Sequence, residues 1–111
     1  MSEARPTIST HVLDTGTGRP AEGVLVVLYR LDLGDEPARL TQALTDGDGR
    51  VRDLLGRPLA AGEYRLEFRV GGAEPTFFRR LVVDFRVTDT SRGYHIPLLV
   101  APYALATYRG S

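Results

Sequence analysis

The clearest pattern in the chain is an alternation of apolar and polar residues with a period of two. Residues 64–70 alternate without a fault, which places their four apolar side chains on one face of a strand. Residues 81–87 repeat this pattern, and residues 23–31 are rich in the β-branched and aromatic residues of a buried strand. Further strands are predicted at residues 7–13, 40–45, 50–55, 94–100 and 102–108.

Short turns separate the predicted strands. Residues 14–20 are interpreted as a glycine loop, and residues 46–49, with the sequence Asp-Gly-Asp-Gly, have the chemistry of a tight hairpin turn. No stretch of ten or more residues has a helical period with caps. Many short strands with close turns in 111 residues indicate an all-β sandwich, and without repeats or linkers we expect a single domain over residues 1–111.

Composition narrows the possible chemistry. The chain has no Cys and no Lys, and its 14 Arg residues balance 14 Asp and Glu residues, so the formal net charge is zero. That balance argues against nucleic acid or an anionic membrane as a partner. The absence of Cys excludes disulfides, a thiol nucleophile and Cys-ligated zinc, and the absence of Lys excludes Schiff-base chemistry. Two His residues, arginines, carboxylates and hydroxyls remain for catalysis.

The N-terminal residues have no targeting pattern. Residues 1–6 are polar and mixed in charge, without the apolar core of a signal peptide. The longest apolar run without Gly or Pro covers residues 24–29, far short of a membrane span. We therefore expect a cytoplasmic protein with no membrane partner, and its apolar strands favour an oligomer.

Two segments that are similar to ligand-binding motifs have simpler interpretations. Residues 16–21 fit the pattern G-x-G-x-x-A, but a proline and a β-rich run follow, where a dinucleotide site needs a helix. Asp46 and Asp48 are similar to the start of a calcium loop. Arg50 and Arg57 nevertheless stand where oxygen ligands are needed, so a turn is the better interpretation.

The two histidines, His11 and His95, each lie inside a predicted strand. Alternation places His95 on the face opposite Ile96 and Leu98. Taken alone, each is more typical of a hydrogen-bonded structural residue. Their comparable positions also fit a shared catalytic site or a zinc site with one carboxylate, although no H-x-H or H-x-x-x-H spacing supports zinc.

Several segments along the chain form recognisable motifs: Ile-Ser-Thr-His-Val-Leu-Asp at 8–14, Gly-Arg-Pro-Ala at 18–21, Thr-Asp-Gly-Asp-Gly-Arg at 45–50, Gly-Glu-Tyr-Arg-Leu-Glu-Phe at 62–68, Tyr-His-Ile-Pro-Leu-Leu at 94–99 and Pro-Tyr at 102–103. Together they resemble the transthyretin-related protein family. By pattern alone, residues 108–111 are a polar tail. As Tyr-Arg-Gly-Ser they resemble the C-terminal motif of the branch that hydrolyses 5-hydroxyisourate, as distinct from the hormone carriers.

The resemblance implies both an architecture and a reaction. The expected fold is a transthyretin-like sandwich of two four-stranded sheets, assembled as a homotetramer with active sites at the dimer–dimer interface. The expected activity opens the ring of 5-hydroxyisourate to give 2-oxo-4-hydroxy-4-carboxy-5-ureidoimidazoline in urate catabolism, without a metal or organic cofactor. The alternative is a non-catalytic transthyretin-like module for ligand binding or protein interaction.

The resemblance also implies the site residues. The catalytic positions are His11, Arg50, His95 and Ser111, and the substrate-binding positions are Tyr108, Arg109 and Gly110. Ring opening needs a water activated near neutral pH and stabilisation of a developing oxyanion, which imidazole and guanidinium groups supply. Ser111 is expected to hydrogen-bond substrate or water. The sequence leaves open which histidine is the base.

Two segments depart from the family pattern. After Val70 the family has a short helix, but here residues 71–76 leave no room for it, and Arg79 stands where a proline is usual. We therefore expect the helix to be missing. A run of small and apolar residues replaces the usual hydroxyl, glycine and tyrosine residues of the last strand and makes it more apolar at the expected subunit interface: Ala101, Ala104, Leu105 and Ala106.

Overall fold

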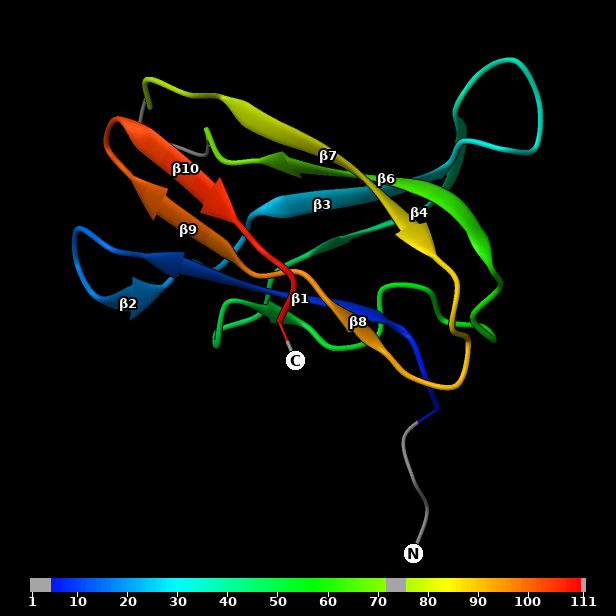
Figure 1. Ribbon diagram of the computed structural model, residues 1–111. Helices are drawn as coiled ribbons and strands as arrows, with labels where there is room; N and C mark the ends of the chain where they lie inside the picture. Colours follow the sequence, from blue (N-terminus) through cyan, green and yellow to red (C-terminus); the bar gives the residue numbers. More distant parts are fainter. Residues whose placement is uncertain (1–4, 72–75, 111) are drawn as a thin grey trace, which may run out of the picture.

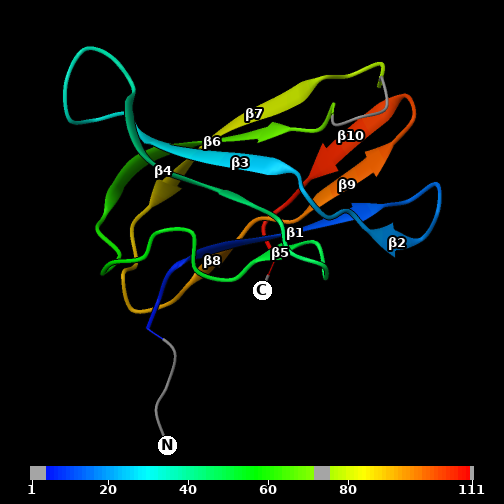
Figure 2. The ribbon, with the colours of Figure 1, turned by 180° about the vertical axis from the view of Figure 1, so that it is seen from behind.

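Two β-sheets pack face to face, as the two views in Figures 1 and 2 show. The computed structural model describes residues 5–71 and 76–110. One sheet has the strand order β4-β3-β6-β7, formed by β3 (Leu25–Arg30), β4 (Ala38–Leu44), β6 (Gly62–Arg69) and β7 (Arg80–Val87). The other has the order β10-β9-β1-β2, with β5 and β8 also pairing with β1. Its strands are β1 (Ile8–Asp14), β2 (Arg19–Pro20), β5 (Arg50–Val51), β8 (Tyr94–His95), β9 (Leu98–Ala101) and β10 (Ala104–Thr107).

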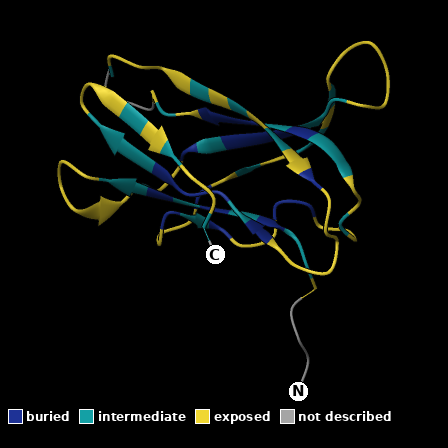
Figure 3. Ribbon diagram, in the orientation of Figure 1, coloured by how far each residue is buried: buried dark blue, intermediate teal, exposed yellow. Residues whose placement is uncertain are grey.

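The core lies between the two sheets and follows the alternation in the sequence. Figure 3 shows that strands of both sheets carry buried residues. Tyr64, Leu66 and Phe68 of β6 are almost completely buried against Ile8 and Val12 of β1 within one apolar cluster. Because β1 buries alternate side chains, its intervening residues point away from the core.

The predicted two-sheet sandwich is confirmed, with local differences between predicted and observed strands. Arg19 and Pro20, predicted as loop, form β2 and pair with the end of β1. The predicted strand 94–100 is divided into β8 and β9, because Pro97 has no N–H to continue the ladder. These short strands give the second sheet six members.

The turn at residues 46–49 differs from the hairpin that its sequence indicates. The strand before it, β4, pairs with β3, whereas the strand after it, β5, pairs with β1 in the other sheet. The Asp-Gly chemistry therefore produces a tight turn that carries the chain from one sheet to the other. This crossing brings Arg50 beside β1.

Helices are absent from the segments 5–71 and 76–110. Consequently no helix in these segments is long or apolar enough to cross a lipid bilayer. The prediction that the family's short helix is missing after Val70 concerns residues 71–76, of which 72–75 lie outside the described residues.

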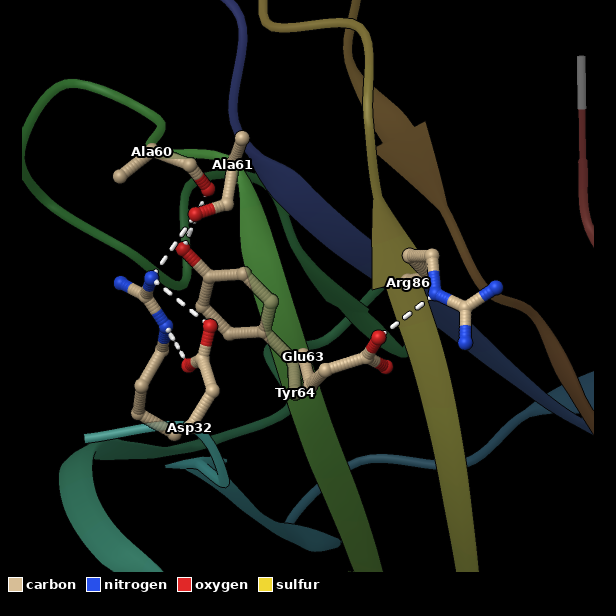
Figure 4. Close-up of polar contacts among 7 residues, drawn as sticks. Asp32, Ala60, Ala61, Glu63, Tyr64 and Arg86 are labelled. Carbon is tan, nitrogen blue, oxygen red and sulfur yellow. Dashed lines mark hydrogen bonds and ion pairs between the residues drawn. The ribbon is translucent and has the colours of Figure 1, made fainter. Parts of the chain in front are cut away.

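A group of polar contacts joins the ends of β3, β6 and β7 (Figure 4). The Arg30 guanidinium donates to the Asp32 carboxylate at 2.5 Å and to the carbonyl of Ala61 at 2.8 Å. It also lies 5.1 Å from the centroid of the Tyr64 ring, whose hydroxyl donates to the carbonyl of Ala60. These contacts fix the entry to β6 at the end of the sandwich.

Candidate functional site

The outward side of β1 carries the first half of the candidate site. Ile8, Thr10 and Val12 are buried in the sandwich, while Ser9 and His11 are only half-buried on the opposite face. This division follows from the two-residue period of a strand. His11 and Ser9 therefore lie on the outer surface of the six-stranded sheet, two positions apart.

Arg50 is placed next to His11 by antiparallel pairing of β5 with β1, in which Arg50 and His11 are direct partners. The preceding turn is fixed by Asp46, whose carboxylate accepts hydrogen bonds from the backbone N–H groups of Arg50 at 3.0 Å and Asp48 at 2.9 Å. The bond from the Arg50 N–H is the main reason why the pKa of Asp46 lies below its usual value. Gly49 adopts a φ of 73°, which suits glycine.

His95 reaches the same surface through parallel pairing of β8 with β1, where Ser9 is its direct partner. The Ser9 hydroxyl lies 2.9 Å from His95 Nδ1. Burial lowers the pKa of His95, and the neighbouring charges of Arg50 and His11 lower it further. His95 is therefore a neutral imidazole at neutral pH, able to accept a proton.

The C-terminal segment lies against His95, but the side chains of this segment contact different residues. Gly110 forms an isolated antiparallel bridge with His95, and its N–H donates to the His95 carbonyl at 2.7 Å. Arg109 instead lies with its guanidinium 4.5 Å from the centroid of the Tyr94 ring. Tyr108 is 56% exposed. Ser111, predicted as a catalytic residue, lies outside the described residues.

The structure thus brings His11, Arg50, His95 and the backbone of Gly110 together on one surface, although they come from four separate segments. Ser9 belongs to this group and was missed in the sequence. Its signal was its position two residues before His11, which places both on the same face of the strand.

The cavities and acidic groups elsewhere do not coincide with this surface. A cavity of about 810 Å³ lies at the far end of the four-stranded sheet, between the starts of β3 and β7 and the end of β6, and a second of about 280 Å³ lies near Pro102. Neither is lined by His11, Arg50 or His95. Within the described part of the chain, no three His, Cys, Asp or Glu side chains gather as a metal site requires. His11, Arg50 and His95 are each half-buried in a single chain.

This arrangement combines a neutral imidazole with a permanent positive charge. A neutral imidazole can take a proton from water, and a guanidinium can stabilise negative charge that develops on an oxygen. Arg50 also offers several N–H donors in a plane, which suits a flat heterocycle rich in carbonyl groups. The surface is therefore suited to hydrolysis of a planar acyl compound.

Comparison with known proteins places this arrangement in a family. The family model described as HIUase/Transthyretin family matches residues 8–110. A 5-hydroxyisourate hydrolase of Caulobacter vibrioides is 42% identical over 94% of this chain and 97% of its own length. The structure of Klebsiella pneumoniae 5-hydroxyisourate hydrolase superposes with a TM-score of 0.81 at 38% identity, covering 95% of this chain and 99% of that one.

The fold is shared more widely than the sequence. A transthyretin from Sparus aurata superposes with a TM-score of 0.85 over 96% of this chain and 97% of that one, but at 22% identity this likeness concerns the fold alone. The family model and the close relatives together cover nearly the whole chain. The chain therefore belongs to the HIUase/Transthyretin family.

Proposed function

We propose that this protein hydrolyses 5-hydroxyisourate to 2-oxo-4-hydroxy-4-carboxy-5-ureidoimidazoline, a step of urate catabolism. The observation that carries the proposal is the convergence of His11, Arg50 and His95 on one outward surface, directly beside the C-terminal segment. Relatives that are about 40% identical over most of the chain carry the name of this hydrolase. Both observations favour a hydrolase over a non-catalytic ligand-binding or interaction module.

The proposed reaction adds one water to a cyclic acyl-urea. The oxygen of water bonds to the ring carbonyl carbon, the carbon–nitrogen bond of the ring breaks, and the released nitrogen takes a proton. One histidine accepts the proton of the attacking water, and Arg50 faces the oxygen on which negative charge develops. The lowered pKa of His95 supports a base at this position, because the imidazole stays neutral at physiological pH.

The C-terminal residues complete the proposed site. We assign substrate binding to Tyr108, Arg109 and Gly110, and a hydrogen bond to substrate or water to Ser111. The bridge between Gly110 and His95 supports this assignment, since it brings the end of the chain to the histidine. Arg109 would have to leave the Tyr94 ring to reach a substrate beside His95.

A homotetramer is the assembly that we propose, with sites where dimers meet. The partial exposure of His11 and His95 in a single chain supports it, because stabilisation of a developing charge by nearby groups is stronger where bulk water is excluded. A second copy over the outer face of the six-stranded sheet would enclose His11 and His95. The cytoplasmic location stays a prediction from the sequence.

The proposed activity is tested by generating 5-hydroxyisourate with a urate oxidase and following its ultraviolet absorbance. The protein should accelerate the decay, and His11→Asn, His95→Asn and Arg50→Gln should each slow it by at least about hundred-fold. Arg52→Gln is the matched control, because this arginine is exposed and its salt bridge to Asp48 lies on the surface. No acceleration over spontaneous decay would leave the binding module as the better hypothesis.

A further inference from the structure

The imidazole of His95 is bounded on two edges, by Ser9, which has no role in the chemistry proposed so far, and by Gly110 of the C-terminal segment. On one edge, the Ser9 hydroxyl lies 2.9 Å from Nδ1. On the other edge lies Gly110, and a Cβ added there would be 2.6 Å from His95 Cδ2. A side chain at position 110 would therefore push the ring aside or lift the C-terminal segment from β8.

The backbone around Ser9 makes its position rigid. Ser9 pairs with His95 in the parallel ladder of β1 and β8, and its carbonyl accepts the N–H of Ile96 at 2.9 Å. Its neighbours Ile8 and Thr10 are buried in the core, and the Thr10 hydroxyl donates to the Ile96 carbonyl at 2.6 Å. The backbone of Ser9 is consequently fixed beside the imidazole, within reach of the Ser9 hydroxyl.

A neutral imidazole has one protonated nitrogen, and the partner at one nitrogen selects the protonation state of the other. If Nδ1 carries the proton and donates to Ser9 Oγ, the lone pair at Nε2 is free to accept a proton. The opposite tautomer has its hydrogen on Nε2 and cannot act as a base there. The residues that the structure describes form no hydrogen bond with Nε2.

We propose that Ser9 is a positioning residue, which accepts a hydrogen bond from Nδ1–H of His95 and so presents a basic Nε2 to the attacking water. Gly110 assists by leaving room for the ring at Cδ2. This inference rests on the proposed hydrolysis, and it assigns the role of base to His95 rather than to His11.

The charges that face His95 explain why a hydroxyl suits this position. Arg50 approaches from β5 and His11 from β1, while Arg109 of the C-terminal segment lies over Tyr94. Burial holds the pKa of His95 below its ordinary value, and the first two groups lower it further. A carboxylate in place of the hydroxyl would raise that pKa and retain the proton on the ring. Ser9 orients the ring without adding charge.

The first experiment compares Ser9→Ala with Ser9→Thr and with the control Ser91→Ala, whose hydroxyl bonds only to the nearby Asp89 carboxylate on the surface. Ser9→Ala should lower kcat by about ten- to hundred-fold, a loss typical of removing a group that orients a histidine, and should leave KM unchanged. Ser9→Thr should recover most of the activity, because it restores the hydroxyl. A kcat for Ser9→Ala within two-fold of the unmodified protein would overturn the proposal.

The second experiment observes His95 by NMR without substrate, so its failure is distinct from failure of the proposed function, and a pH profile of the reaction is measured beside it. Nitrogen NMR shifts of His95 at neutral pH should report Nδ1–H and a free Nε2 in the unmodified protein, and a mixture of tautomers in Ser9→Ala. Ser9→Asp should raise the pKa of His95 and move the acidic limb of the kcat/KM profile to higher pH. An unchanged tautomer ratio in Ser9→Ala, or an unchanged pH profile in Ser9→Asp, would show that Ser9 is merely structural.

Gly110→Ala provides an independent check of the second edge. It should displace the His95 ring and lower kcat, whereas Gly47→Ala, whose added Cβ meets no atom within 4 Å, should leave kcat unchanged. Full activity in Gly110→Ala would remove Gly110 from the proposal.

Discussion

The turn before Arg50 offers a sharp test of how the site is positioned, through the substitution Gly49→Ala. Gly49 is buried with a φ of 73°, and a Cβ there would lie under 3.0 Å from the carbonyl oxygen of Val12 and only 3.0 Å from Cβ of Pro20. The contacts are with backbone and a ring carbon, so no flexible side chain can move away. The N–H of Val12 also donates to the Gly49 carbonyl at 2.7 Å.

The cost follows from two separate effects. A residue with a Cβ loses about 1–2 kcal/mol in the left-handed region. Forcing a carbon into packed surroundings costs about 1–3 kcal/mol more. The free energy of unfolding should therefore fall by about 2–5 kcal/mol, a large part of the roughly 5–15 kcal/mol that holds a typical domain folded. In a domain of this size the Tm should fall by about 8–20 °C.

Urea unfolding and thermal unfolding measure the effect, and Gly47→Ala supplies the control. Gly47 lies in the same turn, has no positive φ, and offers open space to a Cβ, so its substitution should change stability by less than about 0.5 kcal/mol. Displacement of Arg50 by an ångström should also lower kcat by about hundred-fold. Equal stabilities of the two variants would refute the steric reasoning. Full activity in a destabilised Gly49→Ala would show that the turn does not position Arg50 for the reaction.

Three further predictions concern charge and buried hydrogen bonds. Arg50→Gln should raise the pKa of His95, because a neighbouring positive charge is lost. Proton NMR titration measures this rise, and an unchanged pKa would contradict an electrostatic effect of Arg50 on His95. The pKa of Glu67 is lowered, chiefly by the hydrogen bond from an arginine on its own strand, so its contribution to stability is present above its ordinary pKa and disappears as pH falls through the folded-state value. Glu67→Gln should therefore lower the free energy of unfolding at pH 7 and reduce the loss of stability in urea as the pH falls below the ordinary pKa of a glutamate. An unchanged pH dependence would contradict the assignment. Thr10→Val should cost about 1–3 kcal/mol because it leaves the Ile96 carbonyl without its hydroxyl donor, whereas Thr10→Ser should cost less; equal losses in urea unfolding would point to packing instead.

Local chemistry accounts for the parts of the site that the sequence could predict. The alternation in β1 and β8 puts His11 and His95 on the face opposite the buried residues, and the structure agrees. The Asp-Gly sequence at 46–49 predicts a tight turn, which is present, but local chemistry cannot say whether the flanking strands pair with each other. Here β4 pairs with β3 and β5 pairs with β1, in different sheets. The apolar face of each strand then meets the core from the sheet to which that strand belongs.

The sequence by itself determined the all-β class, the strands with their buried faces, and the residue types available for catalysis. These properties depend on neighbours within a few positions, where a period of two and the conformation of glycine act directly. Only the tertiary structure decided which strands lie together. Parallel pairing of β1 with β8 joins Ser9 to His95 across 86 positions. A separate bridge brings Gly110 to His95, and Arg109 lies over Tyr94. A shift of one residue would point every side chain to the opposite face, and burial of the whole core sets that register.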